Sequence, residues 1–482
     1  MAYKHGVYVR EQETSLAAPV TGSAGLNVII GTAPINTVEN PAAAVNTPVI
    51  AYTYKEAVEK MGYSDDFASY TLCEAISAAF SVIGVAPIVM INVLDPEKHS
   101  ADIETKNVNV VNGMAKITEK GILLDQLVVK ANSSPINKDT DYTTTWDNDG
   151  SLNIIINKEG AASDASTLEL QGKKIDPKAV KAADIVGGIE LSSGKETGLE
   201  VIRQVYPKLG VVPGIITAPR FSKDPTVSAA LQAKTNNING VFNCTAFIDI
   251  DCSATGAKRY DGVKAQKEKQ GLTNPNAYAV WLYGKVGENI YSGSTLAAIE
   301  TAYVDAVNDD TPNVSPSNKP LTITASCLED GTEVLLDQEQ ANAVNAVGVA
   351  TLLNMEGFRI WGNNTVAYPA NSDPKDRWLS IRRFFNWTGN NFIRTYFKEV
   401  DNPANPRLIE KIVDSENIKG NGYVARGICA RYEITFDASE NPLTELLNGA
   451  LVFHQYLTPY GPAESITNVL EFDPNALNSL YA

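Results

Sequence analysis

The spacing of apolar residues divides the chain into stretches of different structural character. From residue 26 onward, apolar runs such as LNVIIGTA and APIVMINVL alternate with helical patterns such as SYTLCEAISAAF. The alternation returns between residues 188 and 357, for example in CTAFIDID and AYAVWLYG. It predicts an α/β domain with a parallel sheet and right-handed helical crossovers.

A different pattern interrupts this order between residues 98 and 187. Short alternating strands there are joined by the turn signals Asn112-Gly113 and Asp149-Gly150, which suit the positive φ angles of type I′ hairpins. The segment therefore predicts an antiparallel β domain, a sandwich or a barrel. Because the α/β pattern resumes after it, we expect an insertion that splits the α/β domain into parts 26–97 and 188–357.

Each end of the chain carries an extended segment without a local partner strand. One face of the first segment carries Tyr3, His5, Val7 and Val9. After PYGP at 459–462, one side of the second segment carries Ile466, Asn468 and Leu470. The backbone groups of a strand need partners, so we expect both segments to pair with strands elsewhere.

Composition and charge narrow the choice of partners. The 482 residues carry 40 basic and 56 acidic side chains, a formal net charge of −16. Binding to phosphates requires a positive surface, so we expect no nucleic-acid partner. Against this background, residues 357–398 hold a local excess of basic side chains, which is one of the few charge signals in the chain.

The cysteines and the apolar stretches indicate a reduced, non-membrane protein. The five cysteines are scattered and odd in number, which predicts reduced core cysteines rather than disulfides or a zinc site. The most apolar stretch, residues 78–94, is short and is broken by Gly84 and Pro87, so we expect no membrane insertion. The first residues lack the apolar region of a signal peptide, and we expect folding in the cytoplasm.

A search for catalytic groups yields no site. The only histidines are His5, His99 and His454, so no general base of a Ser-His-Asp triad lies between residues 100 and 453. Asp249 and Asp251 end a predicted parallel strand, where α/β enzymes place their sites, but no histidine, cysteine cluster or glycine-rich loop joins them. Capping of the following helix, or solvation, is the preferred interpretation of these acids. We expect no catalytic residue, cofactor or metal.

The most specific sequence is the last quarter, with GFRIWGNNTV, DPKDRWLSIRRFFNW, KGNGYVARGICARYEITFDASENP and NGALVFHQYLTPYGPAESITNVLEFD. It closely resembles the C-terminal region of contractile-tail sheath proteins, and KHGVYVREQE resembles their opening strand. Many members have a WGARTL-like motif where this chain has WGNNTV, so no role is carried over to Asn363. The resemblance covers nearly the whole chain in order.

The resemblance implies a fold and a mode of assembly. The fold is a subtilisin-like α/β domain with an inserted antiparallel β-sandwich (98–187), then a C-terminal α+β domain (358–482). An N-terminal arm and linker (1–25) and a C-terminal arm from about residue 460 add strands to neighbouring subunits. These subunits form stacked sixfold rings, a helical homopolymer around an inner tail tube, and contract by repacking. Baseplate and tail terminator proteins are the other implied partners.

The resemblance also implies a tube-facing surface on the C-terminal domain. The basic excess there gives the candidates Arg382, Arg383, Arg394 and Lys398. A helix predicted over 442–456, with Asn441 as its cap, is a further candidate, because leucines recur there at helical spacing. Local pairing of the arginines with Glu399 and Asp401 is nearly as well supported.

The particle type and two other classes of protein stay open. The chain fits a bacteriophage tail, assembled in the host cytoplasm, or a headless bacteriocin-like particle. The alternatives are an α/β hydrolase-like enzyme with an unrecognised site, and a surface-layer or adhesin protein. The missing histidine argues against the first, and the missing export signal against the second.

Overall fold

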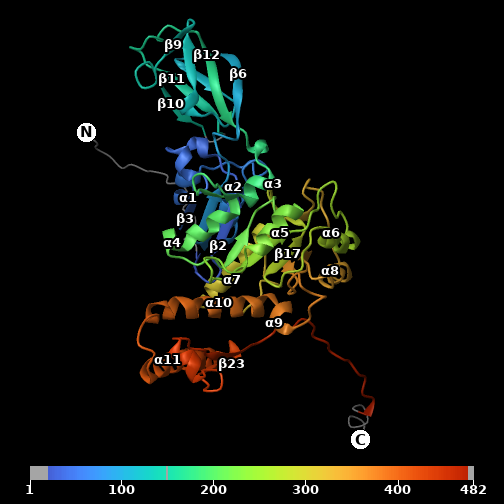
Figure 1. Cartoon of the computed structure of the whole chain (residues 1–482). Helices are drawn as coiled ribbons and strands as arrows, with labels where there is room; N and C mark the ends of the chain where they lie inside the picture. Colours follow the sequence, from blue (N-terminus) through green and yellow to red (C-terminus); the bar gives the residue numbers. More distant parts are fainter. Residues whose placement is uncertain (1–19, 148–149, 476–482) are drawn as a thin grey trace, which may run out of the picture.

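The structure, a computed structural model, describes residues 20–147 and 150–475 (Figure 1). Three parts follow one another along its long axis: a small all-β part, an α/β body, and a part made of helices and one hairpin. The predicted N-terminal strand with Tyr3, His5, Val7 and Val9 lies outside the described residues, as does Asp149.

The body is built on one eight-stranded sheet with the order β22-β21-β17-β16-β15-β2-β5-β3. Its six inner strands run parallel and the two edge strands pair antiparallel. Every residue of β2, β5, β16 and β17 is buried, as in parallel sheets covered on both faces. The predicted mixed α/β architecture with parallel pairing is confirmed. The strands are β2 (Asn27–Gly31), β3 (Pro48–Ala51), β5 (Ile88–Asn92), β15 (Ile215–Thr217), β16 (Thr245–Asp249), β17 (Ala277–Trp281), β21 (Ala350–Asn354) and β22 (Phe358–Trp361).

Helices and short strands surround this sheet. The longest body helix, α7 (Gly293–Val307), is buried over most of its length. The other helices are α1 (Tyr54–Met61), α2 (Thr71–Ser77), α3 (Ala182–Val186), α4 (Val205–Leu209), α5 (Pro225–Ala233), α6 (Val263–Lys269) and α8 (Gln338–Asn345). The short strands are β1 (Val20–Thr21), β4 (Val85–Ala86), β13 (Gly188–Ile189), β14 (Glu196–Thr197), β18 (Tyr283–Val286), β19 (Asn289–Tyr291) and β20 (Ala325–Cys327). All five cysteines are free and buried, as predicted.

The all-β part consists of two antiparallel sheets, β10-β11-β7 and β6-β12-β8-β9. They share one apolar cluster that includes Ile117, Leu152 and Leu168. Asn112 and Gly113 have φ angles of 52° and 75°, as a type I′ turn requires. Ser100 pairs with Ile175, so the chain enters and leaves this part side by side. The strands are β6 (Ser100–Asn109), β7 (Met114–Ile117), β8 (Val128–Ala131), β9 (Ser134–Ile136), β10 (Tyr142–Trp146), β11 (Leu152–Ile156) and β12 (Thr167–Ile175).

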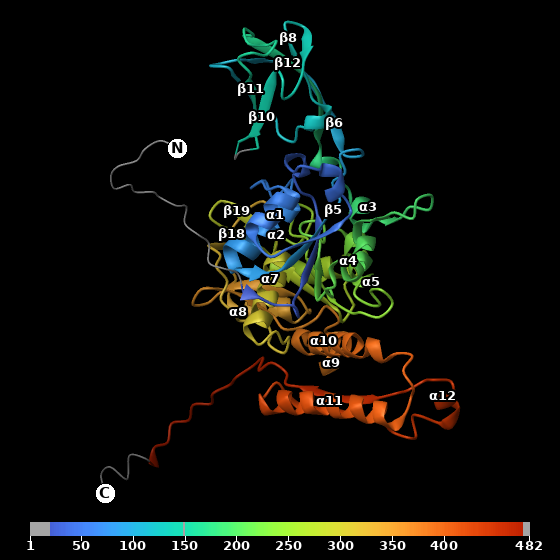
Figure 2. The ribbon, with the colours of Figure 1, turned by 90° about the vertical axis from the view of Figure 1, so that its left-hand side faces the viewer.

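The C-terminal part places two long helices against a hairpin. Figure 2 shows α10 against the body and α11 on its far side. The elements are α9 (Pro374–Arg377), α10 (Leu379–Tyr396), α11 (Pro406–Ala425), β23 (Cys429–Thr435), α12 (Leu443–Leu447) and β24 (His454–Pro459).

The predicted helix over 442–456 is wrong. Helix α12 ends at Leu447, Gly449 has a φ of 78°, and the chain from His454 forms β24. The leucine spacing supports only one turn, and pairing with β23 determines the conformation of the rest. Asn441 is not the cap either: its side chain binds the backbone N–H and carbonyl of Val452, both at 2.8 Å, and closes the connecting loop.

Two buried carboxylates hold the N-terminal end of α7. Glu74 accepts from the backbone N–H of Ser292 at 2.7 Å, and Asp249 from that of Ser294 at 2.8 Å. Negative charge is favourable at this end of a helix. Arg220 donates to Glu74 at 2.7 Å and compensates its charge, whereas burial raises the pKa of Asp249 to about 6. Asp249 thus caps α7 rather than α6, the next α-helix after its strand, and it is buried rather than solvated.

The buried Glu300 of α7 has no side-chain hydrogen bond to any described residue. Glu300 is 5% exposed, and burial raises its pKa to about 7, an effect that Lys319 partly offsets. The pKa is higher in the folded than in the unfolded state. As the pH falls from about 8 to about 5, Glu300 therefore takes up its proton in the folded state before it does so in the unfolded state. The free energy of unfolding rises over this range as the pH falls.

We expect Glu300→Gln to remove this pH dependence. The difference in unfolding free energy between wild type and variant should change by on the order of 2–3 kcal/mol across that pH range, favouring the variant at high pH. Thermal unfolding at several pH values measures it. Glu288→Gln, at a fully exposed position, is the control and should change nothing. A pH-independent difference for Glu300→Gln would contradict the assignment.

Candidate assembly surfaces

Helix α10 joins the body to the C-terminal part through polar side chains. Arg383 forms a two-pronged ion pair with Asp305 of α7, with one contact at 2.9 Å. Asn390 exchanges two hydrogen bonds, of 2.7 and 3.0 Å, with the backbone of Asn243. Residues 383, 386 and 390 share one helix face because they are three or four positions apart. That face fixes α10 to the body.

The predicted basic surface is divided by these contacts. Arg383 is 3% exposed and its partner Asp305 is fully buried, so Arg383 belongs to the interior and not to a surface. Arg382 is mostly buried and binds Asp376 at 3.2 Å. Arg394 and Lys398 are exposed, and neither forms an ion pair with a described residue. The predicted partner Glu399 binds Lys411 at 2.8 Å instead.

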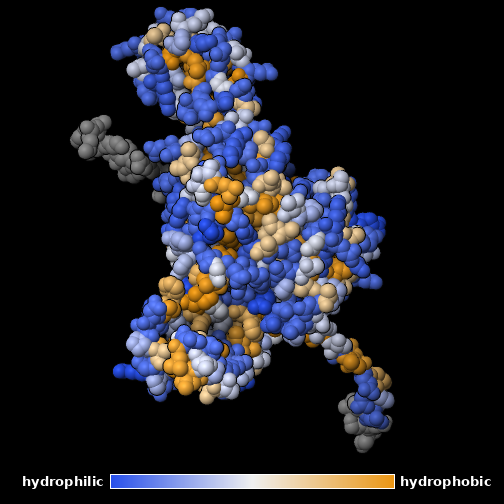
Figure 3. Space-filling view, viewed as in Figure 1, coloured by the Kyte–Doolittle hydropathy of each residue, from blue (hydrophilic) through white to orange (hydrophobic). Residues whose placement is uncertain are grey.

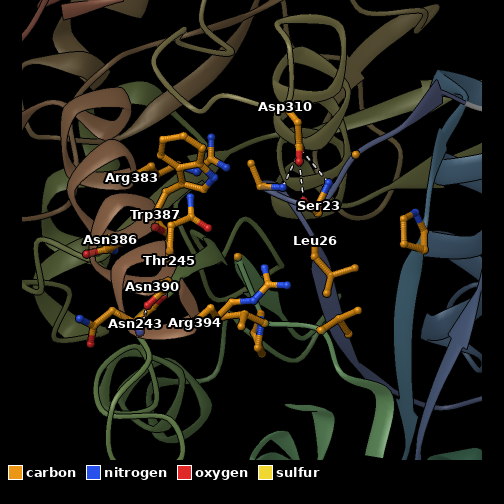
Figure 4. A pocket seen from close by; sticks show the side chains of 18 of the residues that line it. Ser23, Leu26, Asn243, Thr245, Asp310, Arg383, Asn386, Trp387, Asn390 and Arg394 are labelled. Carbon is orange, nitrogen blue, oxygen red and sulfur yellow. Dashed lines mark hydrogen bonds between the residues drawn. The ribbon is translucent and has the colours of Figure 1, made fainter. Parts of the chain in front are cut away.

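A cavity of about 370 Å³ lies between α10 and the body (Figure 4). Trp387 and Arg394 of α10 line it together with Ser23 and Leu26 from the first described segment. Asp310 accepts from the backbone N–H groups of Ser23 and Ala24, both at 2.7 Å, and so fixes the chain near its first described residue. The residues that line the cavity include no histidine or cysteine.

The hairpin of β23 and β24 is the only sheet of the C-terminal part among the described residues. A two-stranded hairpin is marginal by itself, and here it packs on α10 and α11 through Phe384, Ile428 and Tyr432. The hydroxyl of Tyr432 donates to the buried Glu416 of α11 at 2.8 Å. No strand of the described chain pairs with the other side of β23 or of β24.

The segment after β24, residues 460–475, is called the tail below. Arg377 holds its root by donating to Glu464 at 2.7 Å and to Asn364 at 2.8 Å, and it stacks on Trp378. Beyond Glu464 the tail is exposed and pairs with no described strand, and it contains the predicted residues Ile466, Asn468 and Leu470. Figure 1 shows it leading away from the molecule.

Exposed apolar side chains gather in the C-terminal part. Of the 24 large hydrophobic residues exposed in the described chain, 13 follow residue 396. Examples are Phe397, Leu443 and Leu447, and in the tail Ile466, which is 88% exposed. They appear as orange patches over the lower part of Figure 3. Apolar surface concentrated in this way is typical of a contact with other proteins.

The two described histidines make local contacts. His99 accepts from the backbone N–H of Asp95 at 3.0 Å and lies 3.4 Å from Asp184, and His454 lies 3.0 Å from Glu440. Residues 20–147 and 150–475 contain no group of three potential metal ligands. Among the same residues, no helix combines the length and apolar character needed to cross a membrane.

Comparison with known proteins gives a consistent result, although no family model matches the chain. The tail sheath protein of Burkholderia phage BcepMu is 28% identical over 506 aligned positions, covering 99% of this chain and 98% of that protein. The tail sheath protein of Escherichia phage P2 is 25% identical over 74% of this chain and 82% of that protein. The chain is a relative of the contractile tail sheath proteins.

Solved structures show the same fold as this sheath relative. A chain in the anti-feeding prophage baseplate has a TM-score of 0.60 at 12% identity, covering 98% of this chain and all of the other. A chain of the contracted anti-feeding prophage sheath has a TM-score of 0.56 at 13% identity, with the same coverage. The sheath tail protein of Desulfitobacterium hafniense reaches 0.50 at 10% identity, covering 94% of this chain and all of the other.

The sequence pattern did not predict which residues of the body bind the polar side chains of α10. Asp305 and Asn243 precede Arg383 and Asn390 by 78 and 147 residues, and no local pattern connects them. The amphipathic spacing of polar residues within an aromatic helix was the one available signal, because a buried helix face with Arg and Asn requires polar partners.

We expect the buried pair to be essential for docking α10. Arg383→Met leaves Asp305 buried without its counter-charge and should cost about 3–5 kcal/mol of unfolding free energy. The double variant Arg383→Met with Asp305→Leu should recover most of this loss. The exposed Arg394→Met is the control and should cost less than about 0.5 kcal/mol. Equal effects of the two Met variants in chemical denaturation would contradict the role of the pair.

Proposed function

We propose that the chain is a structural subunit of a contractile tail sheath. It polymerises as stacked sixfold rings around an inner tail tube and contracts by repacking its subunits, which drives the tube through the envelope of a target cell. The observation that carries the proposal is the alignment with phage tail sheath proteins along nearly the whole chain. The unpaired hairpin and the exposed tail give it a physical basis.

Subunits are linked by exchanged strands. Residues 1–25 act as the N-terminal arm and linker, with Tyr3, His5, Val7 and Val9 in the pairing strand. The tail acts as the C-terminal arm, with Ile466, Asn468 and Leu470. Strand addition satisfies backbone groups at a sheet edge and covers apolar side chains at the same time. It supplies the partners that a two-stranded hairpin lacks.

The parts of the fold take different places in this assembly. The α/β domain comprises 26–97 and 188–357 together with α3, and the β-sandwich within 98–187 is carried on the outside. Its position at the far end of the molecule from the hairpin supports this placement (Figure 1). The C-terminal domain, 358–482, faces the tube. Arg394 and Lys398 are the exposed basic residues that remain as tube contacts, with Arg382 contributing its partly buried guanidinium.

Contraction is a change of packing between subunits whose own folds stay intact. The ion pair of Arg383 and Asp305 and the bonds of Asn390 make α10 and the body one rigid unit. The arms then accommodate rotation of these units, as in transitions between two packings of rigid bodies. Baseplate and terminator proteins bind the ends of the polymer, which assembles in the host cytoplasm.

Removal of the N-terminal arm tests the proposal. We expect wild-type protein to form striated tubes in negative-stain microscopy, and a chain without residues 1–18 to fold normally but form no long tubes, because strand exchange is lost while each core stays intact. Circular dichroism and thermal unfolding check the fold. Tubes of normal length from the truncated chain would refute the role of the arm, and a wild type that stays monodisperse would refute the sheath function.

Charge reversal tests the tube-facing surface. Arg394→Glu with Lys398→Glu should weaken co-assembly with the tube most at low salt, because exposed charges act through screened electrostatics. Self-assembly of the sheath should persist, since the arms are unchanged. Lys264→Glu with Lys269→Glu makes the same charge change on an exposed face of α6 and serves as control. Unchanged tube binding in sedimentation assays at low salt would exclude these residues as contacts.

A further inference from the structure

Helix α11 closes the outer side of β23, the side away from β24. The side chain of Asn417 in α11 donates to the carbonyl of Ile434 at 3.0 Å and accepts from its N–H at 2.8 Å. Ile434 pairs with Gln455, yet both of its backbone groups point away from β24. Asn417 therefore makes the two hydrogen bonds that a neighbouring strand would make at this position.

A glycine allows the helix to lie this close. A Cβ atom at Gly420 would collide with the carbonyl oxygen and ring of Tyr432, the next residue of β23 with outward backbone groups. Gly422, in the same helix, faces open space, and a Cβ there would meet nothing within 4 Å. Glycine inside a helix costs about 1 kcal/mol relative to alanine, so its presence at 420 has a packing reason.

The outer side of β24, the side away from β23, is open. Backbone groups at Gln455 and Leu457 face outward, because these residues oppose Ile434 and Tyr432 in the alternating ladder. None of these groups bonds to a described residue outside the hairpin. The edge ends at Pro459, which has no N–H to offer. The hairpin thus has one closed edge and one open edge.

We propose that Asn417 and Gly420 close β23 so that a strand from a second copy of this chain is admitted only at β24, and that this strand is the tail segment 466–472. The inference rests on the proposed function and specifies its pairing geometry. The segment is exposed and contains no proline, so every residue can pair. The bond between Arg377 and Glu464 directs the tail away from its own hairpin.

Disulfide cross-linking distinguishes the two edges. Arg431 and Thr458 face each other across the hairpin and are both exposed, so Arg431→Cys and Thr458→Cys form a matched pair. Each is mixed with subunits that carry one cysteine at 466, 468 or 470 and is oxidised in assembled tubes. Adjacent strands lie about 4.8 Å apart, within reach of a disulfide, whereas the second strand lies about twice as far.

The proposal requires intermolecular dimers with Thr458→Cys and none with Arg431→Cys on non-reducing gels. Dimers with Arg431→Cys, or tubes without dimers at either position, would overturn it. Tubes without dimers contradict only the proposed pairing and remain consistent with the sheath function, whereas the absence of wild-type tubes refutes the sheath function itself. The experiment therefore distinguishes a failure of the pairing proposal from a failure of the proposed function. Wild-type tubes, with only the five buried cysteines, give the background.

Variants of α11 test the closing residues directly. Asn417→Ala should raise the amide exchange rate of Ile434 at least about tenfold and should allow Arg431→Cys to cross-link with the tail. Gly420→Ala should likewise expose Ile434, whereas Gly422→Ala should leave it protected. If tubes of the Asn417→Ala variant still form cross-links only through Thr458→Cys, Asn417 does not close the edge of β23. If Gly420→Ala and Gly422→Ala behave alike, the close approach of α11 has no such role.

Discussion

The unpaired backbone of one strand edge is the constraint on which the C-terminal part depends. Strand β24 presents N–H and carbonyl groups that no described residue satisfies, beside apolar side chains that stay exposed. Such an edge is an adhesive surface, and proteins either cover it or use it. Here the neighbouring edge of β23 is covered by Asn417 and Gly420, so the exposure of β24 is not a general failure to protect the sheet.

The contacts of α10 connect that edge mechanically to the rest of the molecule. The helix packs on the hairpin through Phe384 and on the body through the buried pair of Arg383 and Asp305. A buried ion pair is costly to separate once formed, because either partner alone is an uncompensated charge. In the proposed assembly a force on the hairpin therefore moves the body with it, and relative motion is confined to the arms.

The sequence predicts most of the body and little of the assembly surface. Segments such as NVIIG and IVMIN predict buried parallel strands, because a strand covered on both faces is almost entirely apolar. The turn at Asn112 is similarly local, since its φ angle depends on residue type. The helix expected over 442–456 is wrong because pairing with β23, at positions 19 to 30 residues earlier, determines the conformation of 454–459. Local spacing contains no information about such a partner.

The basic residues of α10 also show what the sequence can and cannot predict. A cluster of arginines is visible in the sequence, but whether a guanidinium is free depends on distant acids. Asp305 takes Arg383 into the interior, while Arg394, eleven positions later on the same helix, stays exposed. Gly420 was the available hint for the closed edge, because glycine in a helix interior often marks a close approach. Asn417 gave no hint, since asparagine is equally common on solvated helix faces.

The number of open edges determines what kind of polymer the proposed subunit can form. A tail that adds to β24 of the next copy joins two different surfaces, so each subunit offers one of each and the contact repeats head to tail. Contacts of this heterologous type generate rings or open helices, whereas contacts between two copies of one surface end at a dimer. If β23 were open as well, a tail could add at either edge of the hairpin, and the register of the lattice would be lost. In the proposed assembly, closure of β23 by α11 leaves one hairpin edge for the tail of one neighbour, which favours a regular helical array.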